Sequence, residues 1–460
     1  MFLKFESCVL FGFCVLTFVF CTKIMAKITE VVAREILDSR GDPTVEVQVT
    51  LEDGTIAKAG VPSGKSTGAF EAVELRDNDP RRYQGMGVLT AVEHVNTVLA
   101  KAVVGMEATG QKEIDDSMRA LDGTPNKGRL GANALLGISL AVCRAAALSA
   151  KMPLHQYIAQ LYGKKEARAS FPVPMFNIVN GGKHADSGLS VQEFKVVPFG
   201  IHTFPEQLRA GSEIFHTLQK LLEQKHLTTS VGDEGGFAPR VESHIEALEM
   251  IGRAVTEAGY RLGEDIFIGL DVAADSFYDK NEDQYVLKPE GVALSRESLV
   301  NVYREWIHKY AVVSIEDGLH EEDWDGWATM KEKLEKEEAA WKQMPMLIGD
   351  DLLVTNVERL KKAIEKKACN AVLIKVNQIG TVTETLDCMR LAREHGMNRV
   401  ISHRSGETPD DFIADLAVGT GAEFIKSGSL SRGERLAKYN RLSEIFQSLQ
   451  SVNIPITSVD

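Results

Sequence analysis

Six short apolar runs in the second half of the chain each end in a charged residue or a histidine–arginine pair. Each run has the length and β-branched content of a strand, and most are followed by a stretch with helical periodicity. Alternation of strands and helices indicates a parallel sheet. The runs are IFIGLD, VVSIE, MLIGD, AVLIK, RVISHR and EFIK, which end at Asp271, Glu316, Asp350, Lys375, His403 with Arg404, and Lys426.

The place of these charged residues predicts a function for them. If the sheet closes into a barrel, the C-terminal ends of its strands meet at one mouth, where such barrels carry their active sites. The sequence would then place three carboxylates, two lysines, a histidine and an arginine around one cavity. A buried apolar strand does not repeatedly end in a charge by chance, because each unpaired buried charge is costly.

The first part of the chain has a different pattern. Between residues 44 and 50 valines alternate with polar residues, and Asp53-Gly54 follows, which predicts a hairpin. Helical periodicity appears at about 89–104, 111–120 and 131–150, so this part is predicted to be an α+β unit. The segment 163–174 combines charges, small residues and two prolines, and we take it as the domain boundary. We therefore predict an α+β domain over 25–165 and a barrel domain over 166–460.

The first 24 residues do not match the rest of the chain, because Cys8 to Cys21 is almost continuously apolar. A signal peptide fits the length, but no small-x-small cleavage site follows the apolar core. A membrane anchor is a second interpretation, at the low end of the spanning range. The third, which we favour, is an upstream start codon, because Met25 opens a sensible beginning for a soluble domain. Membrane association is expected only if this extension is a real part of the protein.

The net charge and the cysteines bear on nucleic-acid binding and on the redox state of the compartment. The formal net charge of −13 gives no basic footprint for nucleic acid, so no direct nucleic-acid binding is expected. Outside the first 24 residues the chain has three scattered cysteines without metal-type spacing. They fit free thiols in a reducing compartment, and we expect a cytoplasmic protein.

The carboxylates at three of the strand ends, Asp271, Glu316 and Asp350, are hard oxygen ligands that suit Mg²⁺. The alternative is that each carboxylate caps a helix or pairs with an arginine. Lys375 and Lys426 would lie beside such a metal. Desolvation and neighbouring cations would lower the pKa of either lysine and make it a general base, although either could instead be a salt-bridge partner.

Three glycine-rich segments are further candidates. The segment 180–194 carries His184 and Glu193, and the segment 231–239 carries Asp233 and Glu234. Two of these carboxyls could share acid–base work, one raising the pKa of the other, or both segments could be surface turns. The loop GVPSGKSTG at 60–68 is one residue too short for a Walker A motif, so we interpret it as a mobile loop that closes over an anion or metal.

From about residue 27 to near its C-terminus the chain resembles the enolase family, the glycolytic phosphopyruvate hydratases. The resemblance rests on long matches that occur in the same order and are spread over both domains. It is a resemblance to enolases of the bacterial type. They include REILDSRGDPTVEV, SGKSTG, NGGKHA, QEF, VGDEGGFAP, GLDVA, SIEDGL, GDDLLVTN, LIKVNQIGT, SHRSGET and IKSGSLSRGERLAKYN.

The resemblance implies a fold and a reaction. The expected fold is a modified eight-stranded TIM-type barrel, whose first strands depart from simple βα order, preceded by a smaller α+β capping domain. The expected reaction is the reversible dehydration of 2-phosphoglycerate to phosphoenolpyruvate, with two Mg²⁺ ions per site, the second arriving with substrate. A homodimer or higher homo-oligomer is implied as well. Lys65 and Lys183 depart from the family pattern and add positive charge near the expected phosphate.

The resemblance also implies roles for individual residues. Lys375 matches the base that removes the C2 proton, and Glu234 matches the acid that helps the C3 hydroxyl leave, with Glu193 as its partner. Histidines 184 and 403 are expected to line the same site. The remaining positions are substrate contacts at Gln192, Arg404, Ser405 and Lys426, and metal ligands at Asp271, Glu316, Asp350 and, for the second metal, Ser66.

Two other functions compete with this prediction. One is a different metal-dependent acid-sugar dehydratase of the same superfamily, against which the SGKST loop and the SHRS segment argue. The other is a surface-displayed binding protein, a secondary role that a cell-surface or secreted pool would allow. The apolar N-terminus favours the second, but the chain ends in Asp460 and lacks a terminal lysine.

Overall fold

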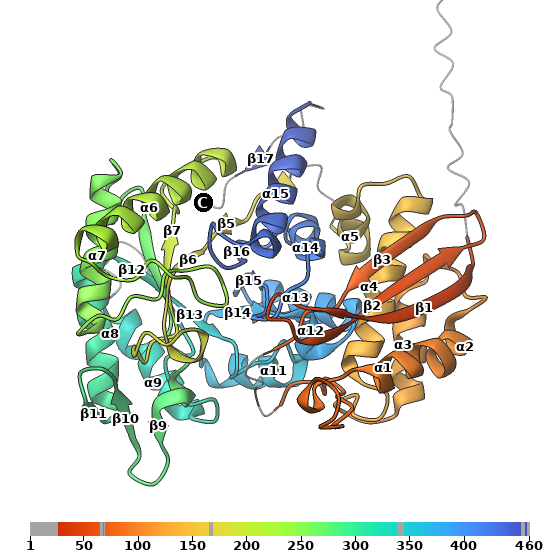
Figure 1. Ribbon diagram of the computed structural model, residues 1–460, viewed down its shortest axis with the longest axis horizontal. Helices are drawn as coiled ribbons and strands as arrows, with labels where there is room; N and C mark the ends of the chain where they lie inside the picture. Colours follow the sequence, from red (N-terminus) through yellow and green to blue (C-terminus); the bar gives the residue numbers. More distant parts are fainter. Residues whose placement is uncertain are drawn as a thin grey trace, which may run out of the picture.

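The computed structural model describes residues 26–64, 68, 70–164, 169–337, 345–451 and 456–457. The N-terminal extension (1–24), Ser66, Lys65 and the predicted boundary between 165 and 166 lie outside these residues, so the predictions made for them remain predictions. Figure 1 shows a small sheet with its helices on the right and a larger barrel-like body on the left.

The small sheet is antiparallel, in the order β1 (Ile28–Leu37), β2 (Pro43–Leu51), β3 (Ile56–Gly60). Alternate valines of β2, Val45, Val47 and Val49, are fully buried, as the sequence pattern predicts. The predicted hairpin joins β2 to β3, and Gly54 takes a positive φ of 83° there. Strand β1 alternates from Val31 to Arg34, where Val31 and Ala33 are buried and Val32 and Arg34 are exposed.

Helices pack against this sheet, and the three predicted helical segments are confirmed. The first is a continuous run of α1 (Leu89–His94), a π-helical turn η2 (Val95–Leu99) and α2 (Ala100–Val103). The others are α3 (Gln111–Asp122) and α4 (Ala132–Ser149), followed by α5 (Leu154–Tyr162). Among the described residues α4 is long and apolar enough to span a membrane, but 89% of it is buried, as in a core helix.

The barrel is a sheet that returns to its own first strand. Its order is β5-β16-β15-β14-β13-β12-β8-β7-β6, and only Met175 separates β5 from β6, so the two ends of the sheet are one segment. Strand β7 is antiparallel to both neighbours, and the other pairs are parallel. The predicted departure from simple βα order is therefore confirmed. The strands are β5 (Val173–Pro174), β6 (Phe176–Asn180), β7 (Glu193–Val197), β8 (Phe267–Asp271), β12 (Val312–Glu316), β13 (Met346–Gly349), β14 (Ala371–Ile374), β15 (Asn398–Ser402) and β16 (Phe424–Lys426).

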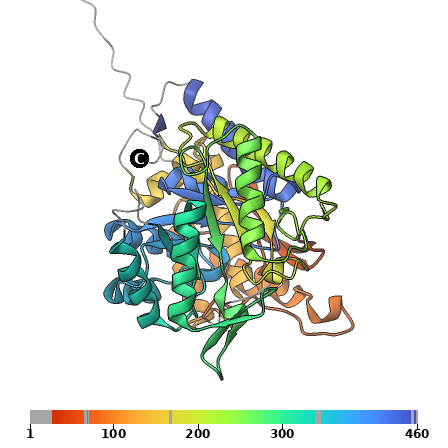
Figure 2. The same cartoon turned by 90° about the vertical axis from the view of Figure 1, so that its left-hand side faces the viewer.

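Helices surround the barrel, and those of its green and teal part lie in front of the strands in Figure 2. They are α6 (Phe204–Gln224), α7 (His244–Glu257), α8 (Arg296–Tyr310), α9 (Trp324–Glu335), α11 (Val357–Lys366), α12 (Val376–Ile379), α13 (Val382–Glu394), α14 (Phe412–Thr420) and α15 (Gly433–Ser451). Smaller elements are the sheet of β9 (Tyr278–Asp279), β10 (Gln284–Leu287) and β11 (Val292–Leu294), and the pair β4 (Ala169–Ser170) and β17 (Ile456–Thr457).

The barrel strands are buried on both faces, which explains their nearly continuous apolar runs. In β13, Met346 and Ile348 join an apolar cluster with Val400 and Phe424, whereas Leu347 joins the larger core that includes the surrounding helices. Glu193, Asp271, Glu316 and Lys426 lie at strand ends, where they can reach a ligand.

The N-terminal domain is docked on the barrel through polar contacts. Ser63 forms a β-bridge with Gly406, which lies in the loop after β15. The backbone N–H of Ser39 donates to the carbonyl of Glu407 at 2.8 Å. Buried Asp115 on α3 accepts hydrogen bonds from the N–H and the hydroxyl of Thr383, at the start of α13. This docking brings Ser63 beside the loop that follows β15.

Candidate active site

The charged ends of the barrel strands surround one cavity, as the sequence pattern predicts. Glu316 does not line this cavity but lies fully buried beside it and contacts Lys426, which does. Lys183 also lines the cavity. The other sequence-predicted residues that line it are His184, Gln192, Glu193, Glu234, Asp271, Asp350, Lys375, His403, Arg404, Ser405 and Lys426.

Lys426 lies at the centre of the carboxylates on one side of the cavity. Its Nζ is 2.8 Å from Oε1 of Glu316, 2.9 Å from Oε2 of Glu193 and 3.0 Å from Oδ2 of Asp271. Burial alone would lower the pKa of Lys426, but these three charges raise it well above its usual value. The side-chain amide of Gln192 donates to Asp271 at 3.3 Å. Lys426 is therefore held as a cation.

A second lysine, Lys195, completes this group, and the sequence analysis missed it. Its Nζ donates to Oε2 of Glu316 at 2.5 Å and lies 3.6 Å from Oε2 of Glu193. It follows Glu193 by two positions on β7, so both side chains point to the same face of the strand. The period of two along this strand was a usable signal for it.

Two of the carboxylate groups whose oxygens lie within 4.8 Å of one another contain the predicted metal ligands. One group contains Asp271 and Glu316 together with Glu193. The other contains Asp350 together with Asp317 and Asp351, both missed by the sequence analysis although each directly follows a predicted ligand. The structure thus brings two of the three predicted ligands into one group and places the third in a neighbouring group.

These two groups fit a divalent cation. Burial, together with the charge of Glu316, raises the pKa of Asp271 to about 7. Burial and neighbouring carboxylates also raise the pKa of Asp317 and of Asp351 well above the usual value. Closely spaced carboxylates that disfavour one another's charge are stabilised by a cation between them, and an all-oxygen donor set suits Mg²⁺.

Lys375 follows β14 and forms an ion pair with Asp350. The predicted lowering of the pKa of the two lysines is wrong for this state of the protein. Burial would lower the pKa of Lys375, but the charges of Asp350 and Glu316 reverse that effect and raise it. Gln378 donates to the other oxygen of Asp350 at 2.8 Å, so this carboxylate is held from both sides.

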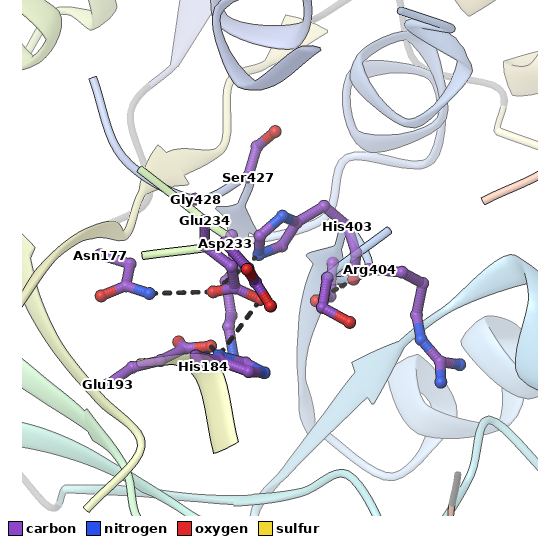
Figure 3. A network of polar contacts seen from close by, with 12 residues as sticks. Asn177, His184, Glu193, Asp233, Glu234, His403, Arg404, Ser427 and Gly428 are labelled. Atoms are coloured by element: carbon purple, nitrogen blue, oxygen red, sulfur yellow. Dashed lines mark hydrogen bonds and ion pairs between the residues drawn. The ribbon is translucent and has the colours of Figure 1, made fainter. Parts of the chain in front are cut away.

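On the opposite side, the carboxylate of Glu234 lies between two histidines (Figure 3). Nδ1 of His184 is 3.4 Å from Oε1 of Glu234 and 3.5 Å from Oε1 of Glu193, and Nε2 of His403 is 3.6 Å from Oε2 of Glu234. The amide of Asn177 on β6, which the sequence analysis did not single out, donates to Oε2 of Glu234 at 2.9 Å. All five side chains are buried.

The two histidines differ in charge. Burial lowers the pKa of His184, but Glu234 and Glu193 raise it to about 9, so His184 is an imidazolium at neutral pH. Burial and the charge of Arg435 lower the pKa of His403 well below its usual value, so this ring is neutral. The environment therefore holds the two rings beside Glu234 in different protonation states.

The predicted raising of one carboxyl pKa by the other is only partly correct. Burial and the charge of Glu234 both raise the pKa of Glu193. The charges of Lys426 and Lys195 lower it, and their effect is larger, so the net shift is downward. Burial raises the pKa of Glu234, but the charge of His184 lowers it well below its usual value. Both glutamates are therefore ionised in this structure.

The remaining wall of the cavity contains a guanidinium and a hydroxyl. Arg404 Nη1 donates to Glu71 at 2.9 Å and to Asn377 at 3.0 Å. The hydroxyl of Ser405 accepts from Arg40 at 3.3 Å. Glu71 and Arg40 belong to the N-terminal domain, and nothing in the local sequence pattern marks them as neighbours of this cavity.

Two family models match the chain. The model described as the enolase N-terminal domain matches residues 28–158. The model described as the enolase C-terminal TIM barrel domain matches residues 168–454, which is more than half of the 460 residues. Every strand end that borders the cavity lies within the second match.

Proposed function

The chain belongs to the enolase family, and we propose that it removes water reversibly from 2-phosphoglycerate to give phosphoenolpyruvate. The family establishes a lyase of enolase type, and the substrate is our proposal. The observation that carries it is that Lys375 and Glu234 line one cavity with Arg404 and Ser405. Such a cavity offers a base, an acid and a cationic anchor for a phosphorylated acid.

We assign the removal of the C2 proton to Lys375. Its amine lies at the end of a rigid barrel strand, which fixes its direction into the cavity. Lys375 must release its own proton before the amine can accept one, because an ammonium has no free lone pair, and the ion pair with Asp350 holds that proton on the lysine. The basicity of Lys375 therefore depends on what neutralises Asp350.

We assign the departure of the C3 hydroxyl to Glu234, with Glu193 as its partner. A hydroxyl leaves as water only if it receives a proton. Glu234 is ionised, and the acidic proton next to it is on the imidazolium of His184, 3.4 Å away, since the closer amide of Asn177 is not an acid. His184 therefore supplies protons to the Glu234 carboxylate, from which the hydroxyl takes one.

We assign recognition of the substrate's anionic groups to Arg404, Ser405, Gln192 and Lys426. Guanidinium and hydroxyl groups bind phosphate oxygens well, and Arg404 and Ser405 are adjacent in the chain. Lys426 is a permanent cation on the other side of the cavity, where it stabilises the negative charge that develops when a proton leaves carbon beside a carboxylate.

We propose Mg²⁺ as the cofactor, with two ions per site. Asp271, Glu316 and Asp350 would hold the first, and Ser66 would contribute to the second. The ion supplies charge stabilisation to a substrate carboxylate that gains negative charge. The two acidic groups support this choice by their oxygen donors and by their mutual destabilisation as anions.

The test is phosphoenolpyruvate formation from 2-phosphoglycerate, followed by its ultraviolet absorbance, with Mg²⁺ and then with excess chelator. The full chain and a chain that begins at Met25 are assayed side by side. We expect turnover that requires Mg²⁺ in both. Activity on non-phosphorylated acid sugars with none on 2-phosphoglycerate would instead assign the protein to another dehydratase of this superfamily and overturn the proposal.

We also propose a homodimer in the cytoplasm. The family resemblance supports the dimer, and the three buried cysteines, Cys143, Cys369 and Cys388, with free thiols support a reducing compartment. Light scattering coupled to size exclusion measures the first, and a monomeric mass would contradict it. Fractionation of cells measures the second, and recovery in the membrane fraction would favour the anchor interpretation of residues 1–24.

A further inference from the structure

Arg435, on the last barrel helix α15, is fully buried and joins the two chain segments that carry the site's side chains. Its Nη1 donates to the carbonyl of Arg404 at 2.6 Å. Its Nη2 donates to the carbonyls of Ser405 at 2.7 Å and of Asp233 at 2.9 Å. One guanidinium thus connects the loop after β15 to the residue before Glu234.

The same guanidinium contacts the ring of His403. Nη1 of Arg435 lies 2.6 Å from Nδ1 of His403. A guanidinium has only donors and is never deprotonated in proteins, so Nδ1 must be the acceptor in this contact. A neutral imidazole with an accepting Nδ1 carries its proton on Nε2.

The other ring nitrogen faces the cavity. Nε2 of His403 is buried and has no hydrogen-bond partner among the described residues, and Oε2 of Glu234 lies 3.6 Å away. That separation exceeds a direct hydrogen bond, so the N–H is available to an oxygen that lies against Glu234. An unpartnered buried donor costs free energy, which is recovered when a ligand atom accepts from it.

We infer that Arg435 is a positioning residue that holds His403 as the neutral tautomer protonated on Nε2, so that His403 is a hydrogen-bond donor facing Glu234. His403 is then neither a base nor a cation, in contrast to His184 on the other side of the same carboxylate. The oxygen that accepts from it is the substrate's departing hydroxyl. This last role rests on the proposed function, whereas the tautomer does not.

The tautomer is measured without any substrate, by NMR of protein labelled with ¹⁵N in histidine. Protonated and unprotonated ring nitrogens give separate resonances, and the His403 signals are identified by their loss in His403→Gln. We expect an unprotonated Nδ1 and a protonated Nε2 that do not change between about pH 6 and about pH 9. A protonated Nδ1, or a ring that titrates in this range, would overturn the inference.

Arg435→Met removes the donors but keeps an apolar side chain of similar length, and Arg441→Met on the same helix is its control, since Arg441 pairs with Asp415 outside the cavity. We expect a changed tautomer and kcat lower by about 10- to 100-fold in the first variant only. An unchanged His403 spectrum in folded Arg435→Met would refute the positioning role.

A pair of substitutions at His403 keeps the test valid if Arg435→Met does not fold. The amide nitrogen of Gln reaches the place of Nε2, whereas that of Asn reaches only the place of Nδ1. We expect His403→Gln to keep kcat within about tenfold of the parent and His403→Asn to lose about 100-fold or more, with little change in KM. Equal losses of kcat in the two variants would show that a donor at Nε2 has no role.

Absence of turnover in the parent protein would refute the proposed function and leave the NMR result to decide the tautomer.

Discussion

At the scale of single residues, the buried negative and positive charges around the cavity do not fully cancel. On one side the three carboxylates of Glu193, Asp271 and Glu316 face the two lysines 195 and 426. Removing one partner of a buried ion pair strongly destabilises a protein, because the other charge is left buried without compensation. Each of these lysines is therefore required for stability. The excess negative charge that remains is what a bound divalent cation would neutralise.

The first prediction concerns Lys375. We expect Lys375→Ala to reduce exchange of the C2 proton with solvent by about 10²- to 10⁴-fold, because no other group is assigned as its base. Loss of a deuterium label from C2 of 2-phosphoglycerate measures the exchange, and Mg²⁺ titration calorimetry measures the metal site, which should be retained. Lys366→Ala, an exposed lysine on α11 paired with Asp325, is the control. Exchange that persists in Lys375→Ala would show that the base is misassigned.

The second prediction separates the two chemical steps. We expect Glu234→Gln to stop phosphoenolpyruvate formation while C2 exchange remains measurable, because proton removal and hydroxyl departure use different residues. Overall turnover should fall by about 10²- to 10⁴-fold. The exposed Glu242, in the same connection before α7, provides the control Glu242→Gln. Parallel loss of exchange and turnover would contradict separate roles for Lys375 and Glu234.

The third prediction concerns pH and His184. Its pKa is about 9 in the folded protein against 6.5 as the reference. A raised folded pKa contributes stability that is fully present below pH 6.5 and is lost as the pH rises through about 9, and here it amounts to about 3 kcal/mol. Urea unfolding at about pH 6 and about pH 9.5 should show His184→Gln losing stability relative to the parent only at the lower pH. The exposed His202→Gln should show no such difference, and a pH-independent deficit in His184→Gln would contradict the assignment.

At the scale of elements, α4 approaches the small sheet at a glycine. A Cβ placed on Gly137 would lie 2.4 Å from Cγ2 of Val47 on β2, which is closer than side chains pack. The helix is buried along most of its length, so it cannot move away from the sheet without disturbing other contacts. Glycine at this position therefore sets the distance between helix and sheet.

The fourth prediction follows from that contact. We expect Gly137→Ala to destabilise the protein by about 1–3 kcal/mol through overpacking, measured as a lower denaturant midpoint. Gly252→Ala in the interior of α7 is a matched control, because its Cβ would meet only Leu262 at 3.4 Å. We expect Gly252→Ala to raise the free energy of unfolding by about 0.5–1 kcal/mol, which is the usual advantage of alanine over glycine inside a helix. Stabilisation by Gly137→Ala would show that the helix has room to shift.

At the scale of the whole molecule, the site is assembled from both domains. Glu71 from the N-terminal domain forms an ion pair with Arg404 of the barrel, and both side chains are almost fully buried there. Asp115 accepts from the N–H of Thr383 in the first turn of α13, which satisfies one of the N–H groups that a helix start leaves unpaired. The two domains therefore depend on each other for buried hydrogen bonds.

The fifth prediction tests this docking. We expect Asp115→Ala to lower the free energy of unfolding by about 1–3 kcal/mol, because the N–H and hydroxyl of Thr383 are then buried without their acceptor. Asp116→Ala removes only the partly exposed ion pairs with Lys112 and Arg119 and should stay within about 0.5 kcal/mol of the parent. Denaturant unfolding of the three proteins measures the difference. Equal effects of the two substitutions would show that the interdomain contact adds nothing.

The sequence alone determined the elements and the location of the chemistry. Apolar runs predict buried strands because apolar side chains are more stable when they are removed from water. The charged residue after each run must then lie at a strand end. Asp271, Glu316, Lys375 and Lys426 were found in this way, and all lie at or beside the cavity. The alternating valines of β2 likewise predicted their own burial.

Only the tertiary structure decided how those groups interact. Asp350 joins Asp317 and Asp351, the pKa of Lys375 rises instead of falling, and Arg435 meets His403. Each of these outcomes depends on the distance between side chains from different strands, helices or domains. Electrostatic energies change steeply with that distance and with burial, and neither quantity is contained in a local pattern of residues.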